Sequence, residues 1–549
     1  MSTSNKIIFY NGKIHHMKNQ TPPAEAIAIK GDRIVSTGRN DKIKDLADKG
    51  TLMIDLEGRA VFPGFIDTHI HLEFVANGLL SVNLRHARDM NDVLRSIKEN
   101  IPEETDRWLT SSCWHPFAQL YEKRLPNRFE IDDVCPNNPV FLPTVGHIAI
   151  ANSRALEIAG ISDSSPDPVG GRIDRDPSTG RITGILYESA IHLVQKWIPP
   201  RDQNVLEKTY REVMRECNRS GITSIITGST TPEELKIWKS LRRKLDMNLR
   251  VNVCCLPTGE EAPLASEEAF ISALNALKPF SGTDDPFLSM GCIKFVLDGG
   301  MTLKTAAVTE PYPNDIDNYG ILTIDQDRLN HLVSICNRHH FRVSIHAVGD
   351  RAIDTVLNAY EKADKETSIR ARRFVLLHGF LMRPDQIERA RQLGVVVATQ
   401  NVFMYEKAEP AKRFLGENRA NMAIPTQSMI NGGLIVTGGS DADINSFNPF
   451  LGIYQAVTRK SKEGNIFGFE ERIDRWKAVC MYTKWAAMQT FEENIKGVLE
   501  PGKYADLIVT SSDILTCSER EIEEMRVIMT VFGGRIVYSA DSSIFETYP

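Results

Sequence analysis

Two histidines one residue apart lie near the start of the sequence, in the stretch FPGFIDTHIHLEF (62–74). Side chains two positions apart on a β-strand point to the same face, so His69 and His71 project together. Paired imidazoles at the end of one strand suit a divalent transition metal. Two histidines hydrogen-bonded inside a turn are the alternative, and the pair alone does not exclude it.

Other side chains able to bind metal follow further short apolar segments. GCIKFVLDGG carries Lys294, FRVSIHAVGD carries His346, RFVLLHGF carries His378 and LIVTGGSD ends at Asp441. The chain has 13 histidines, and four of them stand at the ends of three such segments. This concentration favours a shared metal site over chance. The predicted metal ligands are His69, His71, Lys294, His346, His378 and Asp441.

Lys294 needs a separate explanation, because an ammonium group repels a cation and is costly to bury. Burial lowers the pKa of a lysine, and a neutral amine can take up CO2 to form a carbamate, an anionic ligand with two oxygens. Lys294 is therefore a candidate for N6-carboxylation and for bridging two metal ions. A salt bridge from Lys294 to Asp298 or Asp441 is the alternative.

These residues require a fold that gathers several strand ends. Short β-branched segments alternate with helical stretches, and near-continuous apolar strands of this kind indicate a parallel sheet covered on its outer face. Eight such units indicate an α/β fold of the TIM (β/α)8 type, whose active sites lie at the carboxyl ends of the strands. The segments that follow the opening one are 221–228, 249–256, 291–300, 341–350, 373–380, 394–400 and 434–441.

Two regions lie outside this alternation. Roughly 150 residues separate the opening segment from GITSIITG, far more than a βα connection spans, so we expect an insertion at about 75–215 that covers the histidine-bearing strand ends. Both ends of the chain show short alternating runs punctuated by Gly and Asp, typical of β structure. We expect residues 1–62 and 491–549 to form one small β domain, with the barrel at 63–490.

Composition narrows the possible partners. The 549 residues carry a formal charge of -6 and no dense Lys/Arg run, which argues against nucleic acid as a partner. No signal peptide and no membrane-length apolar run is evident, so we expect a cytoplasmic protein without a membrane partner. Nine scattered cysteines indicate neither a disulfide framework nor a zinc knuckle. A small-molecule substrate is expected, with a homodimer as the candidate assembly.

Together these motifs resemble the amidohydrolase superfamily. PGFIDTHIH, the lysine of the fourth strand, the single histidines of the fifth and sixth, and GSD on the eighth reproduce its ligand order. IKFVLDGG, IHAVGDRAIDTVLNAYE and GVLEPGKYADLIV are similar to its amidohydrolase 3 (YtcJ-like) branch, which includes N-substituted formamide deformylases. GHIAIANSRAL and GILYESA, within the expected insertion, are also similar to that branch. The resemblance implies a distorted TIM barrel with a small β-sandwich built from both termini and a large insertion after the first barrel strand.

The resemblance also implies roles. The paired histidines of the first strand would hold the more buried of two metal ions, and those of strands five and six the more exposed one. Lys294 would bridge the ions, and Asp441 would be both ligand and general base. One or two divalent ions, with zinc expected, would serve hydrolysis of a carbon–nitrogen bond other than a peptide bond (EC 3.5), of the amide or N-formyl type.

Residues that contact the substrate are predicted from position alone. His147 would donate a hydrogen bond to the substrate carbonyl and so take part in catalysis, with packing or a loop-holding hydrogen bond as the structural alternative. The other predicted substrate residues are Trp114, His115, Phe403, Tyr405 and Asp443, for which packing or helix capping is the alternative.

Three rival functions stay open. A mononuclear metal-dependent deaminase could use the same barrel, but such enzymes usually have Glu three residues after the strand-five histidine, and Gly349 occupies that position here. An ester or cyclic-amide hydrolase would use the same ligands. A non-catalytic binding relative would typically have lost some of them.

Overall fold

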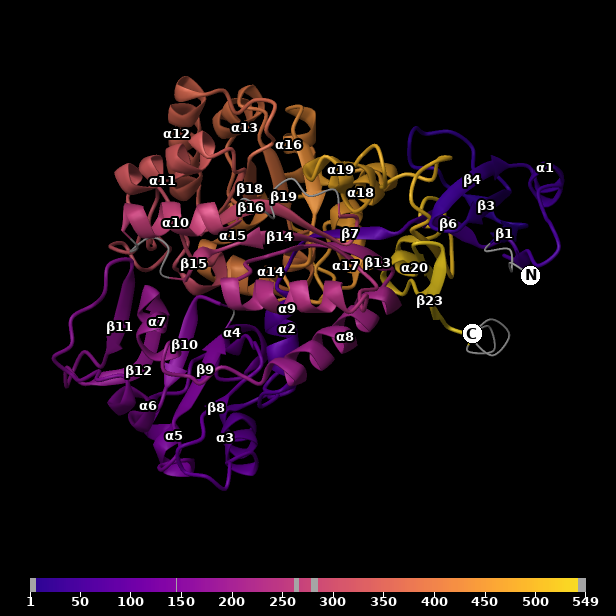
Figure 1. The fold of residues 1–549 in the computed structure, drawn as a ribbon. Coiled ribbons are helices and arrows are strands. Elements are labelled where there is room, and N and C mark those ends of the chain that lie inside the picture. Colours follow the sequence, from indigo (N-terminus) through magenta and orange to yellow (C-terminus); the bar gives the residue numbers. More distant parts are fainter. Residues whose placement is uncertain (1–5, 145, 261–265, 278–284, 542–549) are drawn as a thin grey trace.

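The structure is a computed structural model that describes residues 6–144, 146–260, 266–277 and 285–541. Its centre is an eight-stranded parallel sheet in the order β20-β19-β18-β17-β16-β14-β13-β7 (Figure 1). Each strand falls on one of the eight predicted segments, which confirms the barrel fold. The bounds are β7 Phe65–Ile70, β13 Ile222–Thr227, β14 Arg250–Cys255, β16 Leu288–Val296, β17 Val343–Ala347, β18 Val375–His378, β19 Val396–Thr399 and β20 Ile435–Gly438.

Helices cover the outside of the barrel. Their N-termini carry the expected caps: Asp202 accepts backbone N–H bonds at the start of α8, and Thr231 forms a capping box with Glu234 in α9. The strands they cover are buried along their whole length, which explains their near-continuous apolar sequence. The main barrel helices are α8 Gln203–Arg219, α9 Pro232–Arg243, α10 Glu267–Leu277, α11 Gln326–Arg338, α12 Asp350–Glu366, α13 Pro384–Gln392, α14 Asn401–Leu415, α16 Thr426–Asn431 and α17 Pro449–Thr458. Shorter elements are β15 Pro257–Glu260, η3 Met301–Leu303, α15 Glu417–Met422, η4 Phe469–Glu471, α18 Arg475–Met481, α19 Lys484–Gln489 and α20 Glu519–Glu523.

The barrel closes between β7 and β20 with the help of side chains. The Asp441 N–H donates to the His69 carbonyl at 2.7 Å. The Thr68 hydroxyl donates to the Gly438 carbonyl at 2.9 Å, and the Ser440 N–H donates to Asp67 Oδ1 at 3.0 Å. Side-chain bonds thus stand in for part of the strand ladder between β7 and β20.

Both ends of the chain build a two-sheet β-sandwich, seen beside the barrel in Figure 1. One sheet has the order β4-β3-β1-β5, and the other, β2-β6-β21-β22-β23, pairs β6 with β21 in antiparallel fashion. Phe9 and Ile27 of the first sheet and Leu507 and Val531 of the second share one core. The bounds are β1 Lys6–Tyr10, β2 Lys13–Ile14, β3 Ala26–Lys30, β4 Arg33–Gly38, α1 Asn40–Lys44, β5 Leu52–Asp55, β6 Ala60–Pro63, β21 Leu507–Thr510, β22 Val527–Phe532 and β23 Arg535–Ser539.

The insertion after β7 contains its own five-stranded sheet, in the order β11-β12-β10-β9-β8. It lies on the side of the barrel away from the β-sandwich (Figure 1). Val93, Ile131 and Leu142 belong to a core separate from that of the barrel. Its elements are α2 Leu72–Leu79, α3 Met90–Glu99, β8 Leu109–Thr110, α4 Pro116–Gln119, α5 Arg128–Val134, β9 Val140–Thr144, β10 Ile148–Ala151, α6 Ser153–Ile158, β11 Gly171–Arg175, β12 Ile182–Glu188, η1 Ser189–Ile191 and α7 His192–Gln195.

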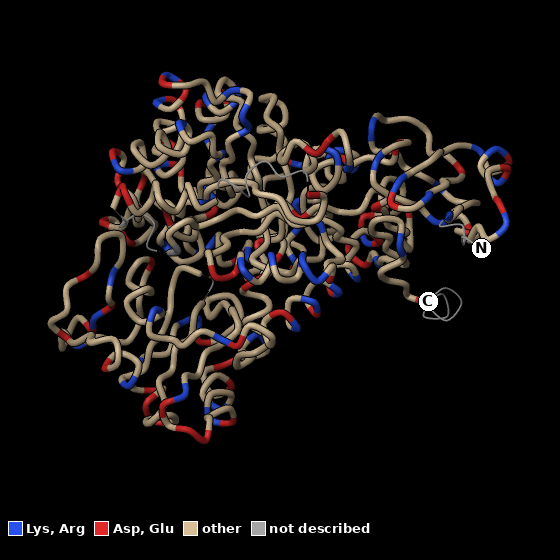
Figure 2. The backbone as a smooth tube through the Cα atoms, in the orientation of Figure 1, with Lys and Arg blue, Asp and Glu red and all other residues tan. Residues whose placement is uncertain are grey.

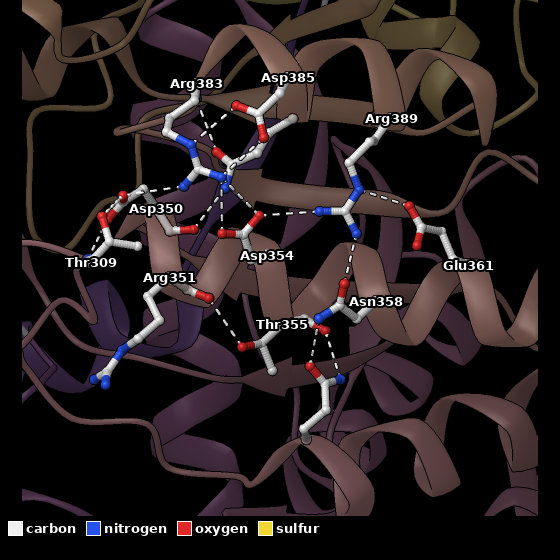
Figure 3. Close-up of polar contacts among 12 residues, drawn as sticks. Thr309, Asp350, Arg351, Asp354, Thr355, Asn358, Glu361, Arg383, Asp385 and Arg389 are labelled. Atoms are coloured by element: carbon white, nitrogen blue, oxygen red, sulfur yellow. Dashed lines mark hydrogen bonds and ion pairs between the residues drawn. The ribbon is translucent and has the colours of Figure 1, made fainter.

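An ion-pair network fixes the helix that follows β17 (Figure 3). Arg383, just before α13, contacts Asp350 at 3.2 Å and Asp354 at 3.0 Å, both in α12. Asp350 also accepts the Thr309 N–H at 2.9 Å. The network therefore ties the start of α12 to α13 and to the loop after β16, close to the strand end that bears His346.

Positively charged Lys and Arg and negatively charged Asp and Glu residues are interspersed over the barrel, the insertion and the β-sandwich (Figure 2). Among the described residues, no helix has both the length and the apolar character needed to cross a bilayer. All nine cysteines are free of disulfide bonds.

Candidate metal centre

The six predicted metal ligands meet at the carboxyl ends of the barrel strands. A cavity of about 230 Å³ is lined by five of them, His71, Lys294, His346, His378 and Asp441. The sixth, His69, is buried beside it, with its ring centroid 5.0 Å from that of His71 and 5.2 Å from that of His378. The rings of His346 and His378 are 4.3 Å apart.

Asp441 holds the first pair of histidines together. Nε2 of His69 and Nε2 of His71 each lie 3.3 Å from Oδ1 of Asp441. Donor atoms of these three residues fall within 4.8 Å of one another, as metal ligands require. Nε2 of His69 is buried and makes no well-formed hydrogen bond with a described residue. A buried ring nitrogen without such a bond fits a metal ligand.

A hydrogen bond to the far ring nitrogen orients two of the imidazoles. Nδ1 of His71 lies 3.2 Å from the Ser229 hydroxyl, and Nδ1 of His378 lies 2.6 Å from Oε1 of Gln400. Metal-binding histidines commonly have such a partner on the nitrogen that does not touch the metal. In both rings Nε2 is the nitrogen left for a metal ion.

His346 is held the other way round. Its Nε2 lies 3.4 Å from Oδ1 of Asp298 and 3.4 Å from the Gly299 carbonyl oxygen, which leaves Nδ1 for a metal. Asp298 is fully buried and accepts the Ala307, Val348 and Gly349 N–H groups at 2.8–2.9 Å. Burial raises the pKa of Asp298 to about 7, although these hydrogen bonds act to lower it.

The electrostatics suit a cation. Burial, reinforced by neighbouring cationic groups, lowers the pKa values of His69, His346 and His378 well below their ordinary range, so the imidazoles are neutral and their lone pairs are free. Burial opposes ionisation of Asp441, but its close contacts with the ring nitrogens of His69 and His71 hold its pKa well below the usual value. A carboxylate among neutral imidazoles is a donor set for a divalent transition metal.

Lys294 lies in the same cavity with 1% of its surface exposed. Burial lowers its pKa to about 8, although Cys254 and Asp441 act in the opposite direction. The neutral amine, the form that reacts with CO2, is therefore far more populated near neutral pH than in an exposed lysine. The alternative pairing with Asp298 is disfavoured, because three backbone N–H groups and His346 already surround that carboxylate.

Two ligands adopt unusual backbone conformations. His378 has φ of 72° and Asp441 has φ of 56°, in the left-handed region that only a few per cent of residues other than Gly occupy, although Asn, Asp and His are enriched there. Such conformations cluster at functional sites, where the surrounding structure holds them.

A close backbone approach fixes His71. A Cβ atom on Gly228, the residue after β13, would lie 2.5 Å from Cε1 of His71. Only glycine leaves room for the ring at this position.

The insertion supplies another wall of the cavity that holds the predicted metal ligands. His147 and Glu188 both line the cavity, and Nδ1 of His147 lies 2.9 Å from Oε2 of Glu188. The His147 ring centroid is 5.0 Å from that of His346. Burial opposes protonation of His147, but the charge of Glu188 raises its pKa. The predicted residue His147 thus lies in the cavity wall. Glu188 lies beside it and was not predicted; its signal was the motif GILYESA.

The two aromatic residues predicted after strand seven, Phe403 and Tyr405, do not lie in the same place. Phe403 lines a second cavity of about 30 Å³ beside the first, together with His346 and Asp441. Tyr405 lies in neither cavity, because its hydroxyl donates to Glu523 of α20 at 2.7 Å and its ring packs against Tyr454.

The other three predicted substrate residues also lie outside both cavities. Trp114 is buried in the insertion core. His115 caps α4, its Nε2 lies 3.0 Å from the Thr302 hydroxyl, and burial lowers its pKa to about 3. Asp443 forms an ion pair with Arg85 and accepts the Cys113 N–H at 3.1 Å. His115 and Asp443 thus join the insertion to the barrel.

Residues 52–538 match the amidohydrolase family. The chain belongs to this family. This amidohydrolase is 29% identical to the putative amidohydrolase YtcJ of Bacillus subtilis, over 97% of this chain and 99% of that one. It is 25% identical to the N-substituted formamide deformylase of Arthrobacter pascens, over 99% and 100% of the two chains.

The crystal structure of an uncharacterized metal-dependent hydrolase from Pyrococcus horikoshii has a similar fold. Its TM-score is 0.74 at 22% identity, covering 94% of this chain and 99% of that one. The predicted family and fold are confirmed, and the amidohydrolase is a hydrolase.

Proposed function

We propose that the protein is a metal-dependent hydrolase that cleaves a carbon–nitrogen bond of the amide or N-formyl type in a small molecule. The observation that carries the proposal is the contact of one Asp441 oxygen with both His69 and His71 at the edge of a cavity that also holds His346, His378 and Lys294. The name of the Arthrobacter relative, a deformylase of N-substituted formamides, supports the type of bond.

One or two divalent ions would be held by these six residues, with zinc expected because imidazole and carboxylate donors suit it. When bound, such an ion supplies Lewis acidity, which lowers the pKa of a water molecule toward neutrality and polarises a carbonyl group. N6-carboxylation of Lys294 would turn a cation into an anionic ligand between the two pairs of histidines.

Asp441 is suited to transfer the proton of the attacking water to the leaving nitrogen. Its low pKa keeps it ionised, so it can orient the attacking water and accept its proton as the water oxygen bonds to the carbonyl carbon. The C–N bond then breaks, and Asp441 returns the proton to the departing nitrogen. The products are an acid and an amine.

His147 is suited to bind the carbonyl oxygen. The raised pKa favours the protonated ring, in which one N–H donates to Glu188 and the other is available to the substrate. A fixed donor at this position stabilises the negative charge that develops on the oxygen. Apolar side chains of Phe74, Leu193 and Leu256 also line the cavity, which suits an apolar substituent on the substrate.

The test combines metal analysis with a substrate screen. Metal per chain is measured after expression with and without bicarbonate, and turnover is measured on N-formyl amines, N-acyl amines, cyclic amides, esters and amino-substituted rings. The His69→Ala/His71→Ala double variant is expected to lose both metal and turnover. The control His331→Ala removes a histidine on α11 that pairs with Glu267 outside the site.

Three results would contradict the proposal. Release of ammonia from a ring amine without amide cleavage would indicate a deaminase. Ester cleavage alone would indicate an esterase. A metal-free protein with no turnover, unchanged by loss of both histidines, would indicate a binding protein.

A further inference from the structure

Glu188 is a buried carboxylate that the proposed reaction does not use directly. It ends β12 in the insertion, is 5% exposed and lines the cavity. We propose that Glu188 is a positioning residue that fixes the His147 ring so that Nε2 of His147 meets the scissile carbonyl. This inference rests on the proposed amide hydrolysis.

Two hydrogen bonds join Glu188 to His147. The Glu188 N–H donates to the His147 carbonyl at 3.0 Å, continuing the antiparallel pairing of β10 with β12. The carboxylate Oε2 accepts the Nδ1–H of His147 at 2.9 Å. Because Nδ1 is taken, Nε2 is the ring nitrogen available to a substrate. The strand register thus determines the direction of the ring.

The second carboxylate oxygen is not used for folding. Oε1 of Glu188 is buried and makes no hydrogen bond with a described residue. A Cβ atom on Gly299 would lie 2.2 Å from this oxygen, so the carboxylate fits only because residue 299 is glycine. A buried carboxylate oxygen without a protein partner disfavours folding, and its presence calls for another reason.

The backbone of Glu188 is also unfavourable for its residue type. Its φ and ψ are 49° and -124°, close to the first central position of a type II′ turn, where glycine is preferred. A side chain kept at such a position despite strain is a sign of function. Glu188 therefore combines three features: a strained backbone, a buried carboxylate oxygen without a hydrogen-bond partner among the described residues, and a hydrogen bond to His147.

These observations separate a positioning role from a structural one. If Glu188 served stability, its replacement by glycine would remove a useful contact and lower the melting temperature. If it positions His147, the same replacement relieves strain and leaves stability unchanged or higher, while catalysis is lost.

The experiment uses the full-length, metal-loaded protein and an N-formyl or N-acyl amine that the wild type cleaves. Glu188→Gly, Glu188→Gln and Glu188→Asp are compared for kcat, KM, metal content and melting temperature. The matched control is Lys123→Gly, which removes the side chain of another insertion residue with positive φ, 51°, away from the cavity.

We expect Glu188→Gly to lower kcat about 100-fold or more, within the range of losses seen when one positioned acid–base or oxyanion group is removed. KM, metal content and melting temperature should not fall with it. Glu188→Gln should be intermediate, because an amide oxygen still accepts from Nδ1–H without carrying the charge. Glu188→Asp should retain more activity than Glu188→Gln, and Lys123→Gly should match the wild type.

A kcat of Glu188→Gly within twofold of the wild type would overturn the inference. So would a kcat loss accompanied by loss of metal, which would mean that Glu188 acts through His346 rather than His147, or by a lower melting temperature. If the wild type cleaves no amide, the proposed function fails and this inference falls with it. If the wild type cleaves amides and Glu188→Gly does so equally well, only this inference falls.

Discussion

Nδ1 of His378 lies 2.6 Å from Oε1 of Gln400, and the Gln400 side-chain amide donates to the Ala398 carbonyl at 3.1 Å. The second bond fixes which end of the Gln400 amide faces the ring. His378 must therefore carry its proton on Nδ1 and present a bare Nε2 to the cavity. One buried amide thus selects the tautomer that can bind a metal.

Replacing Gln400 with Leu should weaken metal binding about 10- to 100-fold, as for other partners of metal-binding histidines. The reason is that the ring can then rotate or take the other tautomer. Competition with a chromophoric chelator measures the affinity. Gln392→Leu, on the exposed face of α13, is the control. An unchanged affinity in Gln400→Leu would show that the bond is dispensable.

Gly228→Ala should displace His71, because the added methyl group would lie 2.5 Å from the ring. The backbone φ of Gly228 is not positive, so the substitution acts through space alone. We expect loss of metal and of turnover with little change in the fold. Gly38→Ala is the matched control, since its Cβ would meet only Ile43 atoms at 3.7–3.8 Å. Full metal content in Gly228→Ala would refute the close approach.

Asp441→Asn should lower kcat about 100- to 10,000-fold, the usual contribution of a general base, while most of the metal stays bound. The amide keeps the size of the side chain but cannot accept the proton of water. Metal analysis and single-turnover rates separate the two effects. Asp385→Asn, a change at an exposed position on α13, should behave as the wild type. An active Asp441→Asn variant would rule out Asp441 as the base.

The ion pair between Arg250 of β14 and Asp506 joins the barrel to the β-sandwich. Arg250 donates to Asp506 at 2.6 and 3.1 Å, and both side chains are buried. Asp506→Ala should lower the free energy of unfolding by about 3–5 kcal/mol, because it leaves a buried guanidinium without its partner.

Urea denaturation measures this loss, and Arg250→Met/Asp506→Leu should recover part of it by removing both charges. Asp32→Ala, which breaks an exposed contact with Arg33, should change stability by about 0.5 kcal/mol or less. If Asp506→Ala is as stable as Asp32→Ala, the pair does not hold the two parts together.

The barrel and the gathering of its six polar strand ends could be predicted because both follow a repeat. Each apolar segment is one strand, and a parallel barrel brings every carboxyl end to the same rim. His69 and His378 are more than 300 residues apart in sequence, yet the barrel brings both to the same rim, where their ring centroids lie 5.2 Å apart. The family resemblance then assigned them roles.

The insertion follows no such repeat, and the substrate residues predicted from position do not gather at one place. His147 reaches the cavity, but Trp114 and His115 turn into the insertion core and its cap. Tyr405 was expected beside Phe403, but both lie on α14, where residues two apart face different directions. Glu188 was not predicted, and Asp298 was considered only as an alternative ion-pair partner of Lys294. The role of such a carboxylate depends on the backbone groups around it, which the sequence does not show.

The composite sheet of the β-sandwich has a consequence for synthesis. Ala60 of β6 and Thr510 of β21 are 450 residues apart and lie next to each other in that sheet. At about 5–20 residues per second, β6 emerges from the ribosome about 20–90 s before its partner exists. During that interval β6 can pair with β2 on one side, but the edge that will face β21 has nothing to pair with. A chaperone that shields the nascent N-terminal strands would therefore raise the yield of this protein more than one that acts on the finished chain.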